Sequence, residues 1–114
     1  MDIREPGDEE LLRRLRAGDE AAFTALYRRR QGGVYRFALQ MSGSEAIAED
    51  VTQEVFLALM REGNSYNPKR GSVAAYMYGI ARKQVLRSLS RIRSETDAAC
   101  LAAVAQPGSD PLAG

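Results

Sequence analysis

Histidine is absent from this sequence of 114 residues, and cysteine occurs once, at Cys100. Without histidine a Ser/His/Asp triad is impossible, and the usual zinc sites and acid/base pairs lose their commonest member. Cys100 cannot form an internal disulfide, and no base lies near it in its alanine-rich segment. Neither a G-x-x-x-x-G-K-[ST] loop nor a C-x-x-C pair occurs. The sequence therefore predicts a binding module that is not an enzyme and needs no cofactor or metal.

Long apolar runs are also missing. The longest, at residues 55–60 and 98–105, are far too short to cross a bilayer, and the polar first residues show no secretory signal. We therefore expect a cytoplasmic protein. The length suits one modest domain, and a hydrophobic content of 45% is enough for a core.

No stretch alternates apolar and polar residues as a half-buried strand does, so the sequence predicts an all-α fold. Helical periodicity and capping residues indicate a compact bundle of one short and three longer helices. We expect Asp8, Asp19 and Ser72 as caps, with either Ser42 or Ser44 before the third helix. The pair Gly32-Gly33 interrupts the second helix, but the periodicity across it favours one continuous helix. The expected ranges are about 8–17, 19–41, 45–62 and 73–93.

From residue 95 onward the sequence becomes alanine-rich and then rich in proline, glycine and serine. Alanines alone give only transient helicity to so short a segment in water. We therefore interpret residues 1–94 as one helical domain and residues 95–114 as a flexible linker.

Cations are gathered in residues 63–94, which contain seven lysines and arginines and no acid, although the net charge of the whole chain is only +1. The first 62 residues carry nine arginines against twelve acidic residues. Lys83, Arg87 and Arg91 recur every four residues, opposite an apolar course of Ala81, Val85, Leu89 and Ile92. A polar loop with one aromatic ring precedes this helix. The pattern favours a nucleic-acid surface over a merely solvated helix.

The third helix carries a second candidate surface. Its buried side is expected at Ile47, Val51, Val55, Ala58 and Leu59, while Asp50, Gln53, Glu54 and Leu57 form another stripe. Phe56, Leu57 and Met60 cannot all turn inward as well. An apolar patch edged by carboxylates indicates docking against a basic partner protein.

Three motifs occur in order: D-x-x-Q-E-x-F from Asp50, a loop that ends Lys69-Arg70-Gly71, and Ile80-Ala81-Arg82 followed by further arginines. With them the chain resembles region 2 of the bacterial sigma factors, in the extracytoplasmic-function group. The resemblance covers about residues 8–93. It implies a domain that takes part in transcription initiation.

The resemblance also implies roles for particular residues. The polymerase-binding set, which docks on the clamp coiled-coil of the largest subunit of core RNA polymerase, is Asp50, Gln53, Glu54, Phe56 and Met60. The loop would capture a flipped base from the non-template strand of the promoter minus-ten element, with phosphates held nearby. The DNA-binding set is Asn64, Ser65, Tyr66, Asn67, Lys69, Arg70, Arg82, Lys83, Arg87 and Arg91. A further implied partner is an anti-sigma factor.

The sequence departs from the family pattern in the last helix. Tyr76-Met77 stands where the family has Trp-Leu, and Lys83 where it has an asparagine that lines the base pocket. Lys83 therefore leaves the preferred base open and favours phosphate contact. We expect Tyr76 to pack in the core, whereas Tyr66 either stacks on a base or covers the loop.

The family's second DNA-binding domain, region 4, is not in this sequence. The chain is either an excised region 2 or a natural variant, and its ending after a linker favours excision. Two other functions stay open. One is a protein-interaction bundle whose basic face binds an acidic partner without a DNA role, and the other is a reader of duplex DNA.

Overall fold

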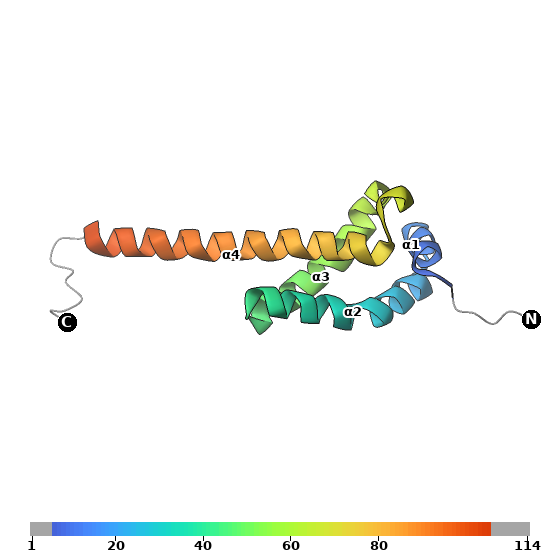
Figure 1. Ribbon diagram of the computed structural model, residues 1–114, viewed down its shortest axis with the longest axis horizontal. Helices are drawn as coiled ribbons and strands as arrows, with labels where there is room; N and C mark the ends of the chain where they lie inside the picture. The colour runs from blue at the N-terminus through green and yellow to red at the C-terminus, as the bar shows by residue number, and fades with distance from the viewer. Residues whose placement is uncertain (1–5, 106–114) are drawn as a thin grey trace, which may run out of the picture.

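The computed structural model describes residues 6–105, with side chains through Ala102. The described residues form four α-helices (Figure 1) and no strand, which confirms the predicted all-α fold. Two short 3-10 turns connect the third and fourth helices. The bounds are α1 Asp8–Arg16, α2 Glu20–Ser42, α3 Glu45–Glu62, η1 Gly63–Ser65, η2 Pro68–Arg70 and α4 Val73–Ala105.

Side-chain caps fix the beginnings of the three long helices. Asp19 accepts hydrogen bonds from two backbone N–H groups of α2, and Ser72 accepts one from α4 at 3.1 Å. Ser44, and not Ser42, caps α3, with a bond of 3.2 Å. Gly43 ends α2 in the left-handed region, at a φ of 67°, where glycine carries no steric penalty. These local signals placed the starts of α2, α3 and α4 and the end of α2.

Asp8 is not the cap of α1 that the sequence predicted. The residue before the helix is Gly7, and no side chain caps this end. The Asp8 carboxylate instead accepts hydrogen bonds from Arg29 and Arg30 of α2, each with an N–O distance of 2.9 Å. Two charged partners from another helix outweigh a local cap. Asp8 thereby ties α1 to α2.

The core lies where α2, α3 and α4 pack against one another, with α1 across one end (Figure 1). Gly33 allows the close approach of α2 and α4, because a Cβ atom there would lie 2.5 Å from the Tyr78 hydroxyl. The helix runs unbroken through Gly32-Gly33, as predicted. The buried apolar side chains are Leu11, Leu12, Leu15, Ala22, Leu26, Val34, Ala38, Ala48, Val51, Val55, Phe56, Ala58, Leu59, Val73, Met77, Ala81 and Val85.

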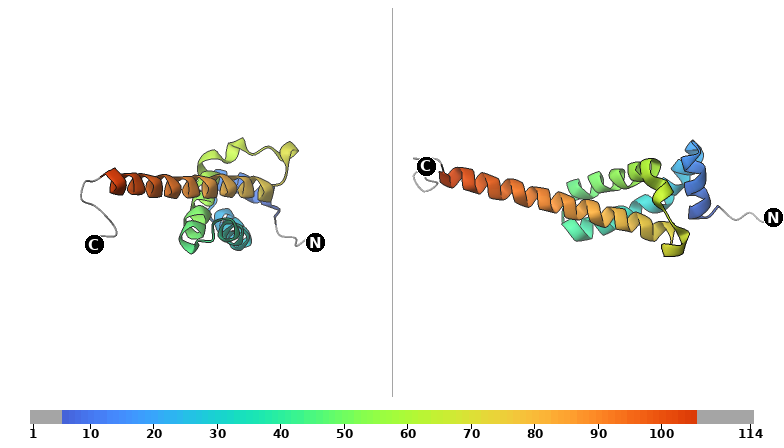
Figure 2. Two further views of the ribbon diagram at one scale, coloured as in Figure 1. Left: turned by 60° about the vertical axis from the view of Figure 1, so that its left-hand side comes forward. Right: turned by 90° about the horizontal axis from the view of Figure 1, so that it is seen from above.

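Helix α4 is longer than predicted and continues through the alanine-rich segment to Ala105. Its second half projects away from the bundle, as the two views of Figure 2 show. Leu89 and Ile92, on the apolar course of this helix, are therefore 36% and 45% exposed. The sequence contains no glycine or proline between Gly79 and Pro107, so nothing local stops the helix earlier. That residues 95–114 serve as a linker stays a prediction, and residues 106–114 lie outside the described part.

Within residues 6–105, no helix has the length and apolar character that a membrane span requires.

Candidate nucleic-acid interface

The loop between α3 and α4 is shaped by its own short-range hydrogen bonds. The side-chain oxygen of Asn67 accepts a hydrogen bond from the backbone N–H of Lys69 at 3.0 Å. The backbone carbonyl oxygen of Asn67 accepts another from the backbone N–H of Arg70, also at 3.0 Å. Pro68 occupies the first position of η2, where no N–H is needed. The amide oxygen of Asn67 is thus used inside the loop. Its NH2 group is the part that can contact a ligand.

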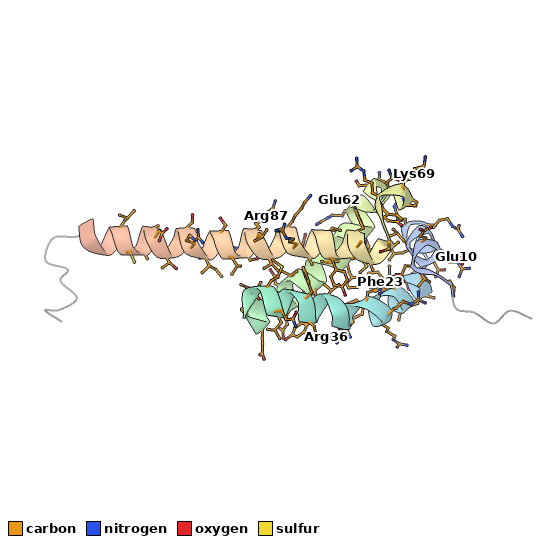
Figure 3. All side chains as sticks on the ribbon, viewed as in Figure 1. Glu10, Phe23, Arg36, Glu62, Lys69 and Arg87 are labelled. Carbon is orange, nitrogen blue, oxygen red and sulfur yellow. The ribbon has the colours of Figure 1, made fainter. Side chains whose placement is uncertain are left out.

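The predicted loop residues lie at the surface and not beneath other helices. Asn64, Ser65, Asn67, Lys69 and Arg70 are all exposed, and Figure 3 shows Lys69 on the outer edge of the molecule. The loop is therefore open to a ligand.

Tyr66 is the half-buried member of the loop. Its hydroxyl lies 3.1 Å from Oε1 of Glu9 in α1 and 3.0 Å from the carbonyl oxygen of Gly71. Its ring meets the ring of Tyr76 edge to face, with centroids 5.6 Å apart. Of the two roles left open, this arrangement favours covering the loop. Withdrawal from water, with the hydrogen bond to Glu9, raises the pKa of Tyr66 above its ordinary value of 10.0.

A surface pocket of about 200 Å³ opens beside these rings. Pockets that hold drug-sized ligands measure roughly 300–1,000 Å³, so this one suits a single planar ring system. It offers aromatic surface, a guanidinium group and amide and hydroxyl groups, which are the contacts that hold an unstacked base. Its lining residues are Ser65, Tyr66, Asn67, Arg70, Gly71, Ser72, Ala75 and Tyr76.

A second hollow, of about 450 Å³, lies between α3 and α4 and includes Lys83 and Arg87. Tyr76 lines both hollows, so the base-sized pocket and the α3–α4 cleft are neighbours. Two carboxylates, Glu54 and Glu62, line the cleft beside its cations. Figure 3 places Arg87, Glu62 and Lys69 along the same edge of the molecule. The Tyr76 hydroxyl donates to the carbonyl oxygen of Glu62 at 3.1 Å, and its half-buried ring packs against the core without being enclosed in it.

The predicted cations do not form one surface. Lys83 and Arg87 line the cleft, whereas Arg82 and Arg91 are exposed outside it. Consecutive helix positions differ by about 100° around the axis, so Arg82 and Lys83 point to different sides of α4. Only part of the predicted set can follow one nucleic-acid strand through the cleft.

The predicted partner-binding face of α3 is divided as well. Asp50, Gln53, Leu57 and Met60 follow one exposed stripe, and the last two are 50% and 56% exposed. Glu54 turns instead towards the α3–α4 cleft and forms an ion pair with Arg61, with an N–O distance of 2.6 Å.

Phe56 does not belong to any exposed patch, contrary to the expectation from its place beside Leu57. It is 2% exposed, and its ring lies 6.2 Å from the ring of Phe23 and 4.8 Å from that of Tyr27. Contacts with these two aromatic rings of α2 hold Phe56 in the core. Phe56 therefore supports the exposed stripe from beneath.

Sequence reasoning missed Arg61 and Gln84, which also line the cleft. Arg61 lies seven residues after Glu54 on the same side of α3, and this spacing was the available signal. In the described residues, no group of three or more metal-ligating side chains is present.

Comparison with known proteins agrees with these features. Residues 26–95 match the family model described as sigma-70 region 2. The chain is 35% identical over 85 residues to an ECF RNA polymerase sigma factor SigK of Mycobacterium sp. (strain KMS), covering 75% of this chain and 42% of that protein. It is 29% identical over 87 residues to the SigK proteins of Mycobacterium bovis (strain BCG / Pasteur 1173P2) and Mycobacterium tuberculosis (strain ATCC 25618 / H37Rv), covering 76% of this chain and 45% of each.

The chain thus spans less than half the length of these curated relatives. Sigma factors are transcription initiation factors without enzymatic activity, in agreement with the prediction that the chain is not an enzyme. Helix α3, the polar loop and the basic part of α4 fall within the matched residues, whereas α1 precedes them. The chain therefore belongs to the sigma-70 region 2 family, as a region 2 domain of the extracytoplasmic-function group of sigma factors.

Proposed function

We propose that this domain binds core RNA polymerase and recognises and helps to open the promoter minus-ten element. The observation that carries the proposal is the base-sized pocket of the loop, open to solvent and adjacent to a cleft with Lys83 and Arg87. A nucleotide extruded from the duplex needs such a pocket, and the phosphates beside it need cations.

In this mechanism the pocket takes a flipped base of the non-template strand. Extrusion costs a few kcal/mol, and stacking on an aromatic ring offsets about 1–3 kcal/mol of it. Tyr76 offers a ring at the pocket, Asn67 an NH2 group and Arg70 a guanidinium group. Lys83 and Arg87 hold phosphates of the same strand. Opening is then driven by binding and needs no ATP.

The partner-binding face in this proposal is the exposed stripe of α3, with Asp50, Gln53, Leu57 and Met60. Half-exposed apolar side chains next to a carboxylate suit a basic, partly apolar partner surface. We assign this face to the clamp coiled-coil of the largest polymerase subunit. An anti-sigma factor is the expected regulator, and the domain acts in the cytoplasm with the polymerase.

The DNA part is tested by titrating fluorescent single-stranded oligonucleotides of different sequence at several salt concentrations. We expect a linear fall of log K with log salt and a preference for one short sequence. Arg87→Ala should weaken all sequences alike and reduce the slope by about 0.7, as expected for one lost phosphate contact with a single strand. Asn67→Ala should reduce the discrimination among bases. Arg28→Ala removes an exposed cation of α2 that lines neither hollow, and serves as the control.

Two outcomes would overturn this assignment. Binding without sequence preference would favour the alternative of a basic face for an acidic protein partner. Stronger binding to duplex than to single strand would favour a duplex reader.

For the polymerase part, a pull-down of core polymerase with Asp50→Ala should recover less complex than the wild type does. An unchanged yield would show that the α3 face is misassigned.

A further inference from the structure

Helix α1 touches the proposed base-binding loop, a contact that no sequence pattern predicts. Glu9 contacts Tyr66 across 57 residues of sequence, through the hydrogen bond of 3.1 Å to its hydroxyl. At the other end of the helix, Arg16 lies against Gly63, where an added Cβ would come within 2.6 Å of the arginine Cδ. The loop therefore rests on α1 at two points.

Helix α1 is itself held firmly. Leu11, Leu12 and Leu15 are at most 7% exposed, and Asp8 pairs with two arginines of α2. Glu9 follows Asp8 directly, so its backbone is fixed by the same anchor. A hydrogen bond to a residue on such a rigid element restricts its partner more than a bond within the loop would.

Tyr66 lines two hollows. On one side is the base-sized pocket, and on the other a hollow of about 300 Å³ between the loop and α1. The Tyr66 hydroxyl has one proton, which it shares between Oε1 of Glu9 and the carbonyl oxygen of Gly71. This three-centred bridge also joins α1 to the end of the loop, just before α4 begins. The bridge thus fixes both the ring that borders the pocket and the backbone at its rim.

We propose that Glu9 is a positioning residue that holds Tyr66 and the loop in the shape that accepts a base. This inference rests on the proposed function, because it concerns the same pocket. Glu9 does not touch the base in this account. It reduces the number of loop conformations that must be lost when the nucleotide binds.

The test compares single-stranded DNA binding by the wild type, four single variants and the double variant Glu9→Ala/Tyr66→Phe of the full chain. Glu9→Ala and Tyr66→Phe each remove the bridge, while Tyr66→Phe keeps the ring. Glu9→Gln keeps an oxygen that can accept the hydroxyl proton. Glu10→Ala is the control, since Glu10 is the next residue of α1 but pairs with Arg13 and Arg14 instead of the loop. Each variant is titrated with the preferred oligonucleotide and with one that carries a different base at the captured position.

We expect Glu9→Ala and Tyr66→Phe to weaken binding of the preferred oligonucleotide about three- to tenfold, the usual range for one hydrogen bond. The discrimination between the two bases should fall with it. The double variant should be no weaker than either single one, because both changes break the same bridge. Glu9→Gln should bind within about twofold of the wild type, which a purely electrostatic role of Glu9 would not allow.

Equal binding by Glu9→Ala and Glu10→Ala would overturn the inference. Tighter binding by Glu9→Ala would overturn it as well, because the bridge would then hold the loop shut. A wild type that shows no base preference at all contradicts the proposed function itself. The two failures are thereby distinguishable.

Discussion

The neighbours Phe56 and Leu57 allow the sharpest test of which side chains of α3 stabilise the core and which bind the partner. Phe56 is 2% exposed and packs against two aromatic rings of α2, whereas Leu57 is 50% exposed. Phe56→Ala and Leu57→Ala therefore change adjacent residues with opposite expected effects. One should affect folding, and the other should affect binding of the partner.

The magnitudes follow from burial. Phe56→Ala removes a fully enclosed ring and should lower the free energy of unfolding by about 3–5 kcal/mol. Leu57 already has half its surface packed, so Leu57→Ala should cost about 1 kcal/mol of stability or less. Full burial of a leucine contributes about 1.5–3 kcal/mol, and a partner that covers the exposed half gains roughly 1 kcal/mol of it. Leu57→Ala should therefore raise the Kd for core polymerase about fivefold relative to the wild type.

The free energy of unfolding is measured by chemical denaturation, and the Kd by capture of core polymerase on immobilised protein. Leu86→Ala is the matched control, since Leu86 is 44% exposed but lies on α4, away from the proposed face. Equal loss of polymerase binding in the Leu57 and Leu86 variants would refute the assignment of the face. A Phe56→Ala variant as stable as the wild type would refute the packing argument.

Two further predictions concern the stability of the fold. Gly32→Ala should raise the free energy of unfolding by up to about 1 kcal/mol, because only a movable arginine end lies near the new methyl group. Gly33→Ala should be clearly less stable than Gly32→Ala in the same denaturation assay, since its Cβ would lie 2.5 Å from the Tyr78 hydroxyl, and equal stabilities would contradict the packing there. The bond from Tyr66 to Glu9 requires a protonated hydroxyl whose pKa is raised, so its stabilising effect should be complete below pH 10 and be lost as the pH rises through the raised pKa. The stability difference between the wild type and Tyr66→Phe should accordingly shrink in alkaline solution, and a difference independent of pH would contradict the bridge.

Local signals were sufficient for most of the fold. Caps such as Asp19 and Ser72 act within three residues of themselves, so the chain needs no tertiary context to place those helix ends. Asp8 shows where this reasoning fails. A carboxylate near a helix start can cap it or pair with a distant cation, and only the position of α2 decides between them.

The sequence by itself determined four helices, the polar loop after α3 and the concentration of cations around α4, because periodicity, capping and charge are properties of neighbouring residues. Tertiary structure decided which of these residues share a surface. It turned Phe56 inward, placed Lys83 and Arg87 in a cleft beside α3, and joined Tyr66 to α1. These outcomes depend on how helices lie against one another, and contacts across 57 residues leave no mark in a local pattern.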